Sequence, residues 1–201
     1  MDTYQVTLRF TEPLLGTVPL DKHIYADFIV EDAPDEEAID EELGTVPESD
    51  DKGKTGFHQM EDGTPFLYDY VIKGFLKDAC GMLRRVRGSE SKALTAYRKV
   101  IDGLVFVEPR QIPLVLPDGE VLSELSRPLR AQTAQGERVA LATSETCPRG
   151  TTLRFELSVL GQADEALLRE WFDYGRLRGL GQWRNASYGR FTYELEQVVP
   201  V

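Results

Sequence analysis

Near its C-terminal end the chain reads Arg176-Leu-Arg-Gly-Leu-Gly-Gln-Trp-Arg-Asn-Ala-Ser-Tyr-Gly-Arg190. Glycine allows positive φ angles and lets a ligand approach the backbone closely. Arginine provides charge and a planar fork for phosphate groups, and aromatic rings provide faces on which bases stack. The composition therefore predicts a loop that binds single-stranded nucleic acid; the alternative is an ordinary turn with its aromatic rings in the core. The candidate binding residues are Arg176, Arg178, Gly179, Gly181, Trp183, Arg184, Asn185, Tyr188, Gly189 and Arg190.

Regular structure is expected on both sides of this loop. Apolar residues at helical spacing, from Leu167 to Phe172, predict a helix over Asp164–Tyr174. After the loop, apolar and polar residues alternate from Phe191 to Leu195 and predict a final strand. The clearest strand in the chain is predicted before the helix, over Thr152–Val159, from the same alternation.

The N-terminal half adds elements of both kinds. They are a strand over Tyr4–Phe10, a helix with apolar positions from Val71 to Val86 and Asp69 as N-cap, a helix over Ser91–Ile101, and strands over Leu104–Val107 and Ile112–Leu116. The last strand lies beside a Pro117-Asp-Gly119 turn, which suggests a hairpin. The order β–α–β–β–α–β predicts one α+β domain over residues 1–201, with a ferredoxin-like (RRM-like) antiparallel sheet, helices on one face and inserted segments.

The formal charge of −11 argues at first against a nucleic-acid partner. The charge is unevenly distributed, however. Residues 1–63 contain 17 acidic and 4 basic side chains, whereas residues 64–201 contain 17 acidic and 19 basic ones. Within the acidic part, residues 31–54 have few apolar side chains to bury, so they predict a mobile insertion. The basic residues of the second part leave a nucleic-acid ligand possible.

Two further sets of cations are candidates for binding. Residues 126–142 predict a polar, extended arm in which Arg127, Arg130 and Arg138 clamp a nucleic-acid strand or cross to a neighbouring subunit. The alternative is a solvated loop whose arginines pair with the acidic insertion. Lys73 lies near a predicted helix start, where anions are favoured, and is the second candidate. Its alternative role is an ion pair with the acidic residue four positions earlier.

Several classes of protein are not expected. No stretch approaches the about 20 apolar residues of a membrane helix, and the N-terminus lacks the pattern of a secretory signal. The two histidines and the lack of CxxC or HxxxH spacing give no expectation of zinc or of another cofactor. Cys80 and Cys147 are expected as buried free thiols in a reducing cytoplasm, with one disulfide as the alternative. No catalytic motif is found, and His23 is the only candidate general base.

Four stretches occur in an informative order: a strand with a glycine-bearing loop at Tyr4–Gly16, a helix start at Pro65–Lys77, a strand at Glu145–Leu157 and the glycine loop at Gly179–Phe191. In the same order they resemble four segments of the RAMP superfamily (repeat-associated mysterious proteins). These segments are the first strand and its loop, the opening of the first helix, a later strand and the signature glycine loop. The superfamily includes backbone and crRNA-processing subunits of CRISPR effector complexes.

The resemblance implies a non-catalytic backbone-type subunit that holds single-stranded nucleic acid, RNA in preference to DNA, between the Lys73 helix start and the Gly179–Gly189 loop. It also implies a cytoplasmic protein of antiviral defence, including phage-borne relatives, that assembles side by side with itself or with other CRISPR subunits. Two other functions stay open. One is an interaction factor that imitates a CRISPR subunit, as an anti-CRISPR protein would, and the other is a crRNA-processing endoribonuclease.

Overall fold

The computed structural model describes residues 1–21, 42–47, 53–133, 136–161 and 163–198 of the 201-residue chain. Its strands are β1 (Asp2–Phe10), β2 (Leu14–Leu15), β3 (Val18–Pro19), β4 (Lys54–Gly56), β5 (His58–Gln59), β6 (Pro65–Tyr68), β7 (Val105–Glu108), β8 (Gln111–Val115), β9 (Ser123–Thr133), β10 (Gly136–Cys147), β11 (Thr152–Val159) and β12 (Phe191–Val198). Its main helices are α3 (Asp69–Leu83), α4 (Tyr97–Leu104) and α5 (Glu165–Arg178), with 3-10 turns η1 (Glu90–Lys92) and η2 (Arg184–Ala186). These elements confirm the predicted α+β class. Among the described helices, none is long and apolar enough to cross a bilayer.

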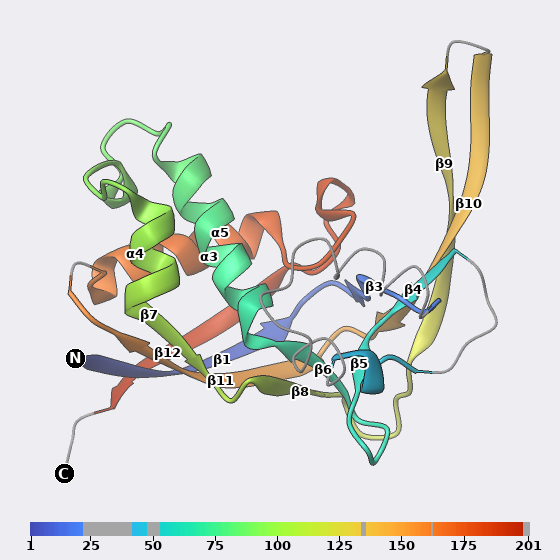
Figure 1. Ribbon diagram of the computed structural model, residues 1–201, viewed down its shortest axis with the longest axis horizontal. Coiled ribbons are helices and arrows are strands. Elements are labelled where there is room, and N and C mark those ends of the chain that lie inside the picture. The colour runs from blue at the N-terminus through green and yellow to red at the C-terminus, as the bar shows by residue number, and fades with distance from the viewer. Residues whose placement is uncertain (22–41, 48–52, 134–135, 162, 199–201) are drawn as a thin grey trace.

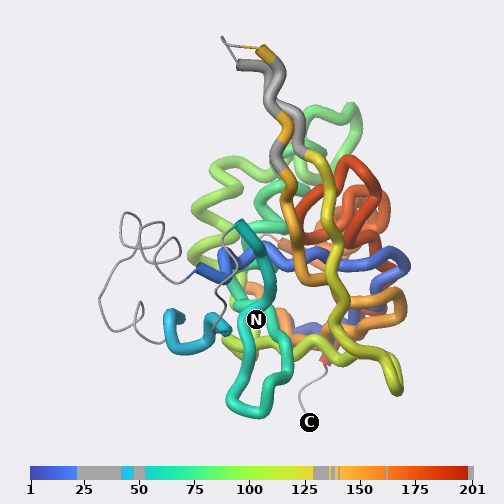
Figure 2. The backbone as a smooth tube through the Cα atoms, turned by 90° about the vertical axis from the view of Figure 1, so that its right-hand side faces the viewer, coloured from blue at the N-terminus to red at the C-terminus, as the bar shows by residue number. Residues whose placement is uncertain are grey.

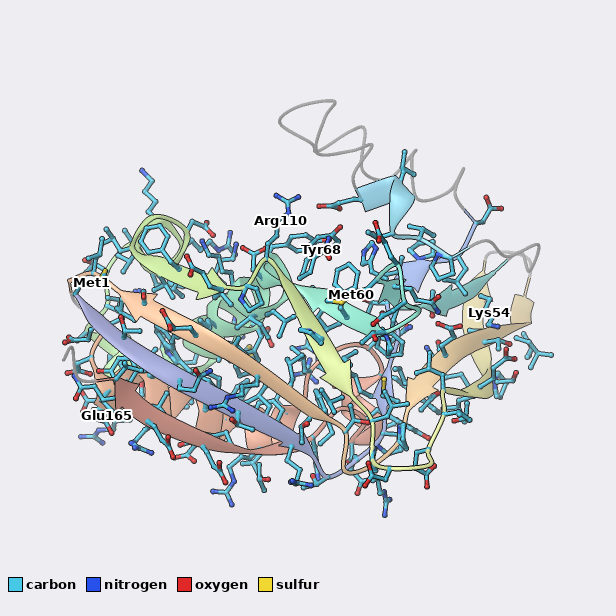
Figure 3. All side chains as sticks on the ribbon, turned by 90° about the horizontal axis from the view of Figure 1, so that it is seen from below. Met1, Lys54, Met60, Tyr68, Arg110 and Glu165 are labelled. Carbon is cyan, nitrogen blue, oxygen red and sulfur yellow. The ribbon has the colours of Figure 1, made fainter. Side chains whose placement is uncertain are left out.

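A seven-stranded sheet forms the body of the protein. Its order is β12-β1-β11-β8-β6-β5, and β7 also pairs with β11. The strands that pair in this sheet run antiparallel. Helices α3, α4 and α5 lie together over one face (Figure 1), and the view from below shows the opposite face without them (Figure 3). The apolar core therefore lies between the sheet and this helical layer.

The central strand β1 shows how the sequence sets the register of the sheet. Its even-numbered residues from Tyr4 to Phe10 are buried, and the residues between them are more exposed. Val6 pairs with Phe155 of β11 and with Leu195 of β12, so apolar side chains meet across three strands. A shift of one residue would turn this set toward solvent, which is why the alternating pattern predicts the strand and its buried face correctly.

Helix α5 begins where the sequence predicts. The carboxylate of Asp164 accepts a hydrogen bond from the Leu167 backbone N–H at 2.9 Å, which caps the first turn. The helix continues through Gly175 to Arg178, one turn beyond the predicted end. A Cβ atom at Gly175 would lie 2.4 Å from Cζ of Phe191. This glycine therefore permits close packing inside the helix rather than ending it.

The predicted polar arm, residues 126–142, lies in a long hairpin that belongs to a second sheet. This five-stranded sheet has the order β2-β10-β4-β3, and β9 pairs with β10. The β9–β10 hairpin projects away from the body of the protein, as two perpendicular views show (Figures 1 and 2). Val139 and Leu141 of β10 are 61% and 76% exposed. Residues 126–142 lack the regular alternation from which β1 was predicted, so the sequence indicates an extended arm rather than two paired strands.

Three local expectations in the middle of the chain are wrong. Tyr68, rather than Asp69, occupies the N-cap position of α3, and no side chain caps it. The helix predicted from Ser91 starts at Tyr97, after the 3-10 turn η1. Strand β8 pairs with β6 and β11, so the turn at 117–119 does not close the hairpin suggested for it.

Part of the acidic tract lies within the described residues. Val46 is only 2% exposed and packs with Val18, and the Thr45 hydroxyl lies 3.2 Å from that of Tyr68. Residues 42–47 therefore differ from the expected loosely held insertion, because they carry an apolar side chain that the core accepts. The rest of the expected insertion, apart from 53–54, and the candidate base His23 lie outside the described residues.

Both cysteines are buried and free, which confirms the expectation of unpaired thiols. Burial raises the pKa of the Cys147 thiol to about 12, so it stays protonated at neutral pH. Burial also raises the pKa of Cys80. Neither thiol has the thiolate character that a nucleophile needs.

His58 is buried beneath the edge of the main sheet. Its Nδ1 lies 2.9 Å from the Thr45 hydroxyl, and its ring packs on Phe66 and Tyr68 with centroid distances of 5.5 and 4.7 Å. Burial lowers the pKa of His58 from 6.5 to about 4. The folded protein therefore contains this imidazole in its neutral form at physiological pH.

We expect this histidine to weaken the fold under mild acid. Since the folded pKa is depressed, the contribution of the neutral histidine to stability is complete above the unfolded pKa of 6.5. As pH falls below 6.5, the unfolded chain takes up the proton, and the contribution is lost progressively until about pH 4, where the folded histidine is protonated too. The free energy of unfolding should decrease by about 1–2 kcal/mol between about pH 7.5 and about pH 5.5. Denaturant titrations of the parent and of His58→Asn, which keeps an acceptor without titrating, measure the difference. An equal decrease in both proteins would contradict the assignment.

Candidate nucleic-acid interface

The glycine loop, residues 179–190, is fixed to the body of the protein by backbone hydrogen bonds. The Gly189 N–H donates to the Pro13 carbonyl at 2.8 Å, and the Thr11 N–H donates to the Arg190 carbonyl at 2.8 Å. Within the loop, the Leu180 N–H donates to the Gly189 carbonyl at 2.9 Å. The loop that follows β1 and the glycine loop therefore form one packed unit, as Figure 1 shows for their backbones.

The glycines of the loop allow its own backbone segments to approach one another. Gly179 and Gly189 have φ angles of 82° and 70°, in the left-handed region. A Cβ at Gly179 would lie 2.4 Å from the Tyr188 carbonyl oxygen, and one at Gly189 would lie 1.9 Å from that of Leu180. Gly181 likewise lies against Leu14 and Leu15. The sequence interpretation assigned this closeness to a ligand, whereas the observed contacts are within the protein.

The arginines of the loop have acidic and amide neighbours. Arg184 Nη1 lies 2.7 Å from Asp78 Oδ2 of α3, and Arg178 Nε lies 4.0 Å from the same oxygen. Arg178 also donates to Asn185 Oδ1 at 2.8 Å. Asp78 thus holds two cations of the loop in place and neutralises part of their charge. It is a site residue that the sequence interpretation missed, because its partners lie about a hundred residues away.

The two remaining arginine candidates also contact neighbouring groups of the protein. Arg176 pairs with Asp173 of its own helix at 3.5 Å, and both side chains are more than half exposed. Arg190 Nε donates to the Leu177 carbonyl at 2.8 Å and so connects the end of α5 with the start of β12.

The aromatic residues of the loop stack on each other. The rings of Trp183 and Tyr188 lie 5.1 Å apart with an interplanar angle of 9°. Trp183 is 40% exposed, so it does not belong to the core as the alternative interpretation supposed. The Arg127 guanidinium of β9 lies 4.9 Å from the centroid of the Trp183 ring. One aromatic pair and one arginine therefore lie together where the hairpin meets the loop.

A polar network connects the loop to the second sheet. The Gln182 side-chain amide donates to Gly16, to Thr55 at 2.7 Å and to Ser144 at 3.1 Å, and its carbonyl accepts from Arg127 at 2.9 Å. The Arg127 guanidinium also donates to the Ser144 hydroxyl at 3.1 Å. Gln182 was not a sequence candidate, since a single glutamine carries no pattern. Its four partners come from four different segments of the chain.

Three other candidates lie apart from the loop. Lys73 Nζ lies 3.4 Å from the Asp102 carbonyl oxygen of α4 and 5.5 Å from the Phe106 ring of β7. It therefore faces α4, and no contact between Lys73 and the glycine loop is seen among the described residues. Arg130 and Arg138 belong to β9 and β10, where their backbones pair with Val139 and Ala131. Their side chains lie outside the described part of the structure.

The described side chains at the glycine loop are mainly cationic, amide and aromatic. Within the described ranges, no group of three histidine, cysteine or acidic residues is placed to hold a metal ion. His58 is buried in its contacts with Thr45 and two aromatic rings. Arginines, an amide and stacked rings are what the loop presents, and these groups suit phosphates and bases.

Comparison with known proteins identifies the fold. Neither the family models nor the curated proteins that were searched match the chain. A chain in the cryo-EM structure of the type III-B Cmr-beta complex bound to cognate target RNA is similar, with a TM-score of 0.59 and 12% identity over 98% of this chain. The match spans 60% of that chain's length. A chain of a type IV-B CRISPR complex is also similar, with a TM-score of 0.46 and 14% identity over 96% of this chain and 90% of that one. The type III-B match shows that the chain has the fold of a chain of that CRISPR effector complex, as its resemblance to RAMP proteins predicts.

Proposed function

We propose that this protein is a non-catalytic CRISPR-type subunit that binds single-stranded RNA against its glycine loop and the base of the β9–β10 hairpin. The observation that carries the proposal is that Arg178, at the end of α5, lies with Arg184, Trp183 and Tyr188 of the glycine loop beside an arginine-bearing hairpin. Such a combination supplies cations for phosphates and aromatic faces for bases. The similar Cmr-beta chain belongs to a complex that contains target RNA, which supports the choice of ligand.

The sheet order supports a ferredoxin-like domain at the centre of this subunit. Strands β12, β1, β11 and β7 are neighbours in that order, with α3 between β1 and β7 in sequence and α5 between β11 and β12. This order, with one helix in each half, is that of a split β–α–β fold. The second sheet and the hairpin are additions to it, and they supply one side of the proposed RNA site.

A protein partner is a second candidate, favoured by the exposed apolar residues of the hairpin. Val139 and Leu141 leave 61% and 76% of their surfaces open, and Val121, two residues before β9, leaves 73%. A projecting hairpin with such side chains suits assembly with another copy or with a CRISPR subunit, including an inhibitory one. Sedimentation at increasing protein concentration, with and without RNA, separates assembly from RNA binding.

The proposal is tested with a labelled single-stranded RNA of about 25 nucleotides and a DNA of the same sequence. We expect RNA to bind, with an affinity that falls as salt rises because counterions are released, and to remain intact with or without magnesium. Absence of binding at about 50 mM salt would refute the proposal. Cleavage of the RNA would replace it by the endoribonuclease alternative.

Two substitutions on either side of one ion pair should change this affinity in opposite directions. Arg184→Ala removes a cation, so it should weaken binding and reduce the slope of log affinity against log salt by up to about 0.7. Asp78→Asn removes the acid that neutralises Arg178 and Arg184, so it should tighten binding about two- to fivefold at low salt. Anisotropy titrations at four salt concentrations measure both effects.

Arg154→Gln is the matched control, because Arg154 lies on the open face of β11 among Gln5, Thr7 and Glu194. Loss of its charge tests for a general effect of net charge. If Arg184→Ala and Arg154→Gln weaken binding equally, the loop has no special place in RNA binding. Thermal melting of each variant establishes that the fold is retained.

A further inference from the structure

Arg127 is a buried arginine without an acidic partner. It is only 6% exposed, although it lies on β9 at the base of a projecting hairpin. Its hydrogen bonds go to two neutral groups, the Ser144 hydroxyl at 3.1 Å and the Gln182 carbonyl at 2.9 Å. It makes no ion pair with any carboxylate in the described part of the chain. Burial of an arginine is ordinarily accompanied by a carboxylate, so this residue requires an explanation.

The guanidinium also has an unused donor. Its Nε is buried and has no hydrogen-bond partner. A guanidinium offers five N–H donors in a planar fork, whose edges match the oxygens of a phosphate or carboxylate. Buried donors in native proteins are almost always satisfied. An unpartnered Nε on a buried guanidinium with no negative neighbour is suited to an anion that fits the site.

Trp183 covers this guanidinium, and its backbone is in an uncommon conformation. The ring centroid lies 4.9 Å from the Arg127 carbon Cζ, and the φ angle of Trp183 is 53°. Ser187, at the other end of the η2 turn, also has a positive φ angle of 73°. L-residues rarely adopt this region, so the turn that positions the indole is held by its surroundings.

We propose that Arg127 is a phosphate-binding residue that Trp183 covers until nucleic acid arrives. On binding, the indole moves from the guanidinium to a base, and the Arg127 fork takes a phosphate of the strand. The phosphate supplies the negative charge and the acceptor that Arg127 lacks, and the base replaces the arginine as the partner of the indole. The identity of the strand as RNA rests on the function proposed above, whereas the anion site does not.

The first test uses inorganic phosphate, so it is independent of RNA. Trp183→Ala uncovers Arg127, and about 50 mM phosphate should then raise the melting temperature by about 2–4 °C relative to chloride at equal ionic strength. The parent, with its indole in place, should show a rise of less than about 1 °C. The double variant Trp183→Ala with Arg127→Gln should not respond. An equal response of all three proteins, or a lack of response in Trp183→Ala, would overturn the proposal.

The second test uses the single-stranded RNA. Arg127→Gln should lower affinity at least tenfold and reduce the salt slope by about 0.7, as loss of one phosphate contact requires. Arg127→Lys, which keeps the charge but loses the fork, should retain the slope and lose affinity by a smaller factor. A residue that only clamps the hairpin would change affinity without changing the slope. Arg154→Gln remains the control for net charge.

The outcomes separate the two proposals. If the parent binds RNA and Arg127→Gln binds it with unchanged affinity and slope, the Arg127 site is refuted and the proposed function stands. If RNA does not bind at all, the proposed function fails, and the phosphate response of Trp183→Ala alone decides whether Arg127 is an anion site. Melting curves of Arg127→Gln and Arg127→Lys must match the parent within about 3 °C, and the lysine variant serves if the glutamine variant does not fold.

Discussion

Gly189→Ala is expected to destabilise the protein by about 3 kcal/mol or more, the largest effect of any change in the glycine loop. An L-residue at the φ angle of 70° costs about 1–2 kcal/mol by itself. The new Cβ would also lie 1.9 Å from the Leu180 carbonyl oxygen, so the backbone must move. That movement strains the hydrogen bonds from Leu180 to Gly189 and from Gly189 to Pro13, each worth about 1 kcal/mol. Denaturant unfolding should show the loss, with a decrease in melting temperature of about 6–12 °C.

Gly119→Ala is the matched control for this prediction. Gly119 has a similar φ angle of 78°, but a Cβ there would have nothing within 4 Å. Only the conformational cost of about 1–2 kcal/mol should appear. Equal destabilisation by the two substitutions would show that the close approach at Gly189 carries no energy. A Gly189→Ala protein as stable as the parent would contradict the packed loop described above.

The sequence predicts those parts of the fold in which local pattern and tertiary packing agree. The alternation in Tyr4–Phe10 and in Thr152–Val159 is the alternation of a sheet with one covered face, so both strands appear where expected. Helix α5 has a capping aspartate and an apolar stripe, and its start is therefore clear. Its end is not clear, because Gly175 has the same appearance in the sequence whether it breaks a helix or allows Phe191 to approach.

Such a pattern does not predict the hairpin, because its two strands pair with each other along nearly their whole length. Strands β9 and β10 satisfy each other's backbone groups over eleven residue pairs, from Ser123 with Thr146 to Thr133 with Gly136. Residues 126–142 have no regular alternation in the sequence, and their polar composition suggests an extended arm. At the inner end of the hairpin, Arg127 and Ser144 are buried.

For the candidate site, the sequence indicates which residues of the loop lie together, but it does not indicate which distant residues contact them. The sequence indicates that Arg184, Trp183 and Tyr188 belong to one loop, because they are adjacent in the chain. It does not indicate that Asp78 from α3 and Arg127 from β9 complete the set, since only the folded chain brings them to the loop. Lys73 lies in the first half of α3, as the sequence suggests, and its side chain contacts α4 and β7.

The two tryptophans of the chain should respond to truncation in opposite ways. Trp171 is 0% exposed and its indole N–H donates to the Ser91 hydroxyl at 2.9 Å. Trp171→Ala should therefore lower the free energy of unfolding by about 3–5 kcal/mol, as is typical of a large aromatic core residue. Trp183 is 40% exposed and stacks on one ring, so Trp183→Ala should lower it by less than about 1 kcal/mol.

For RNA binding, we expect the larger loss from Trp183→Ala and the smaller one from the Trp171 variant. Trp183→Ala should lose about 1–3 kcal/mol of binding free energy if its indole stacks on a base. A folded Trp171→Ala protein should bind RNA like the parent, because the Trp171 side chain lies inside the helical layer. If the alanine variant does not fold, Trp171→Phe replaces it, since phenylalanine keeps most of the core packing. Unfolding and RNA titrations of the same preparations give both quantities. If Trp183→Ala is stable and binds RNA like the parent, the indole is not part of the RNA site. If Trp183→Ala is destabilised by more than about 3 kcal/mol, the indole belongs to the core.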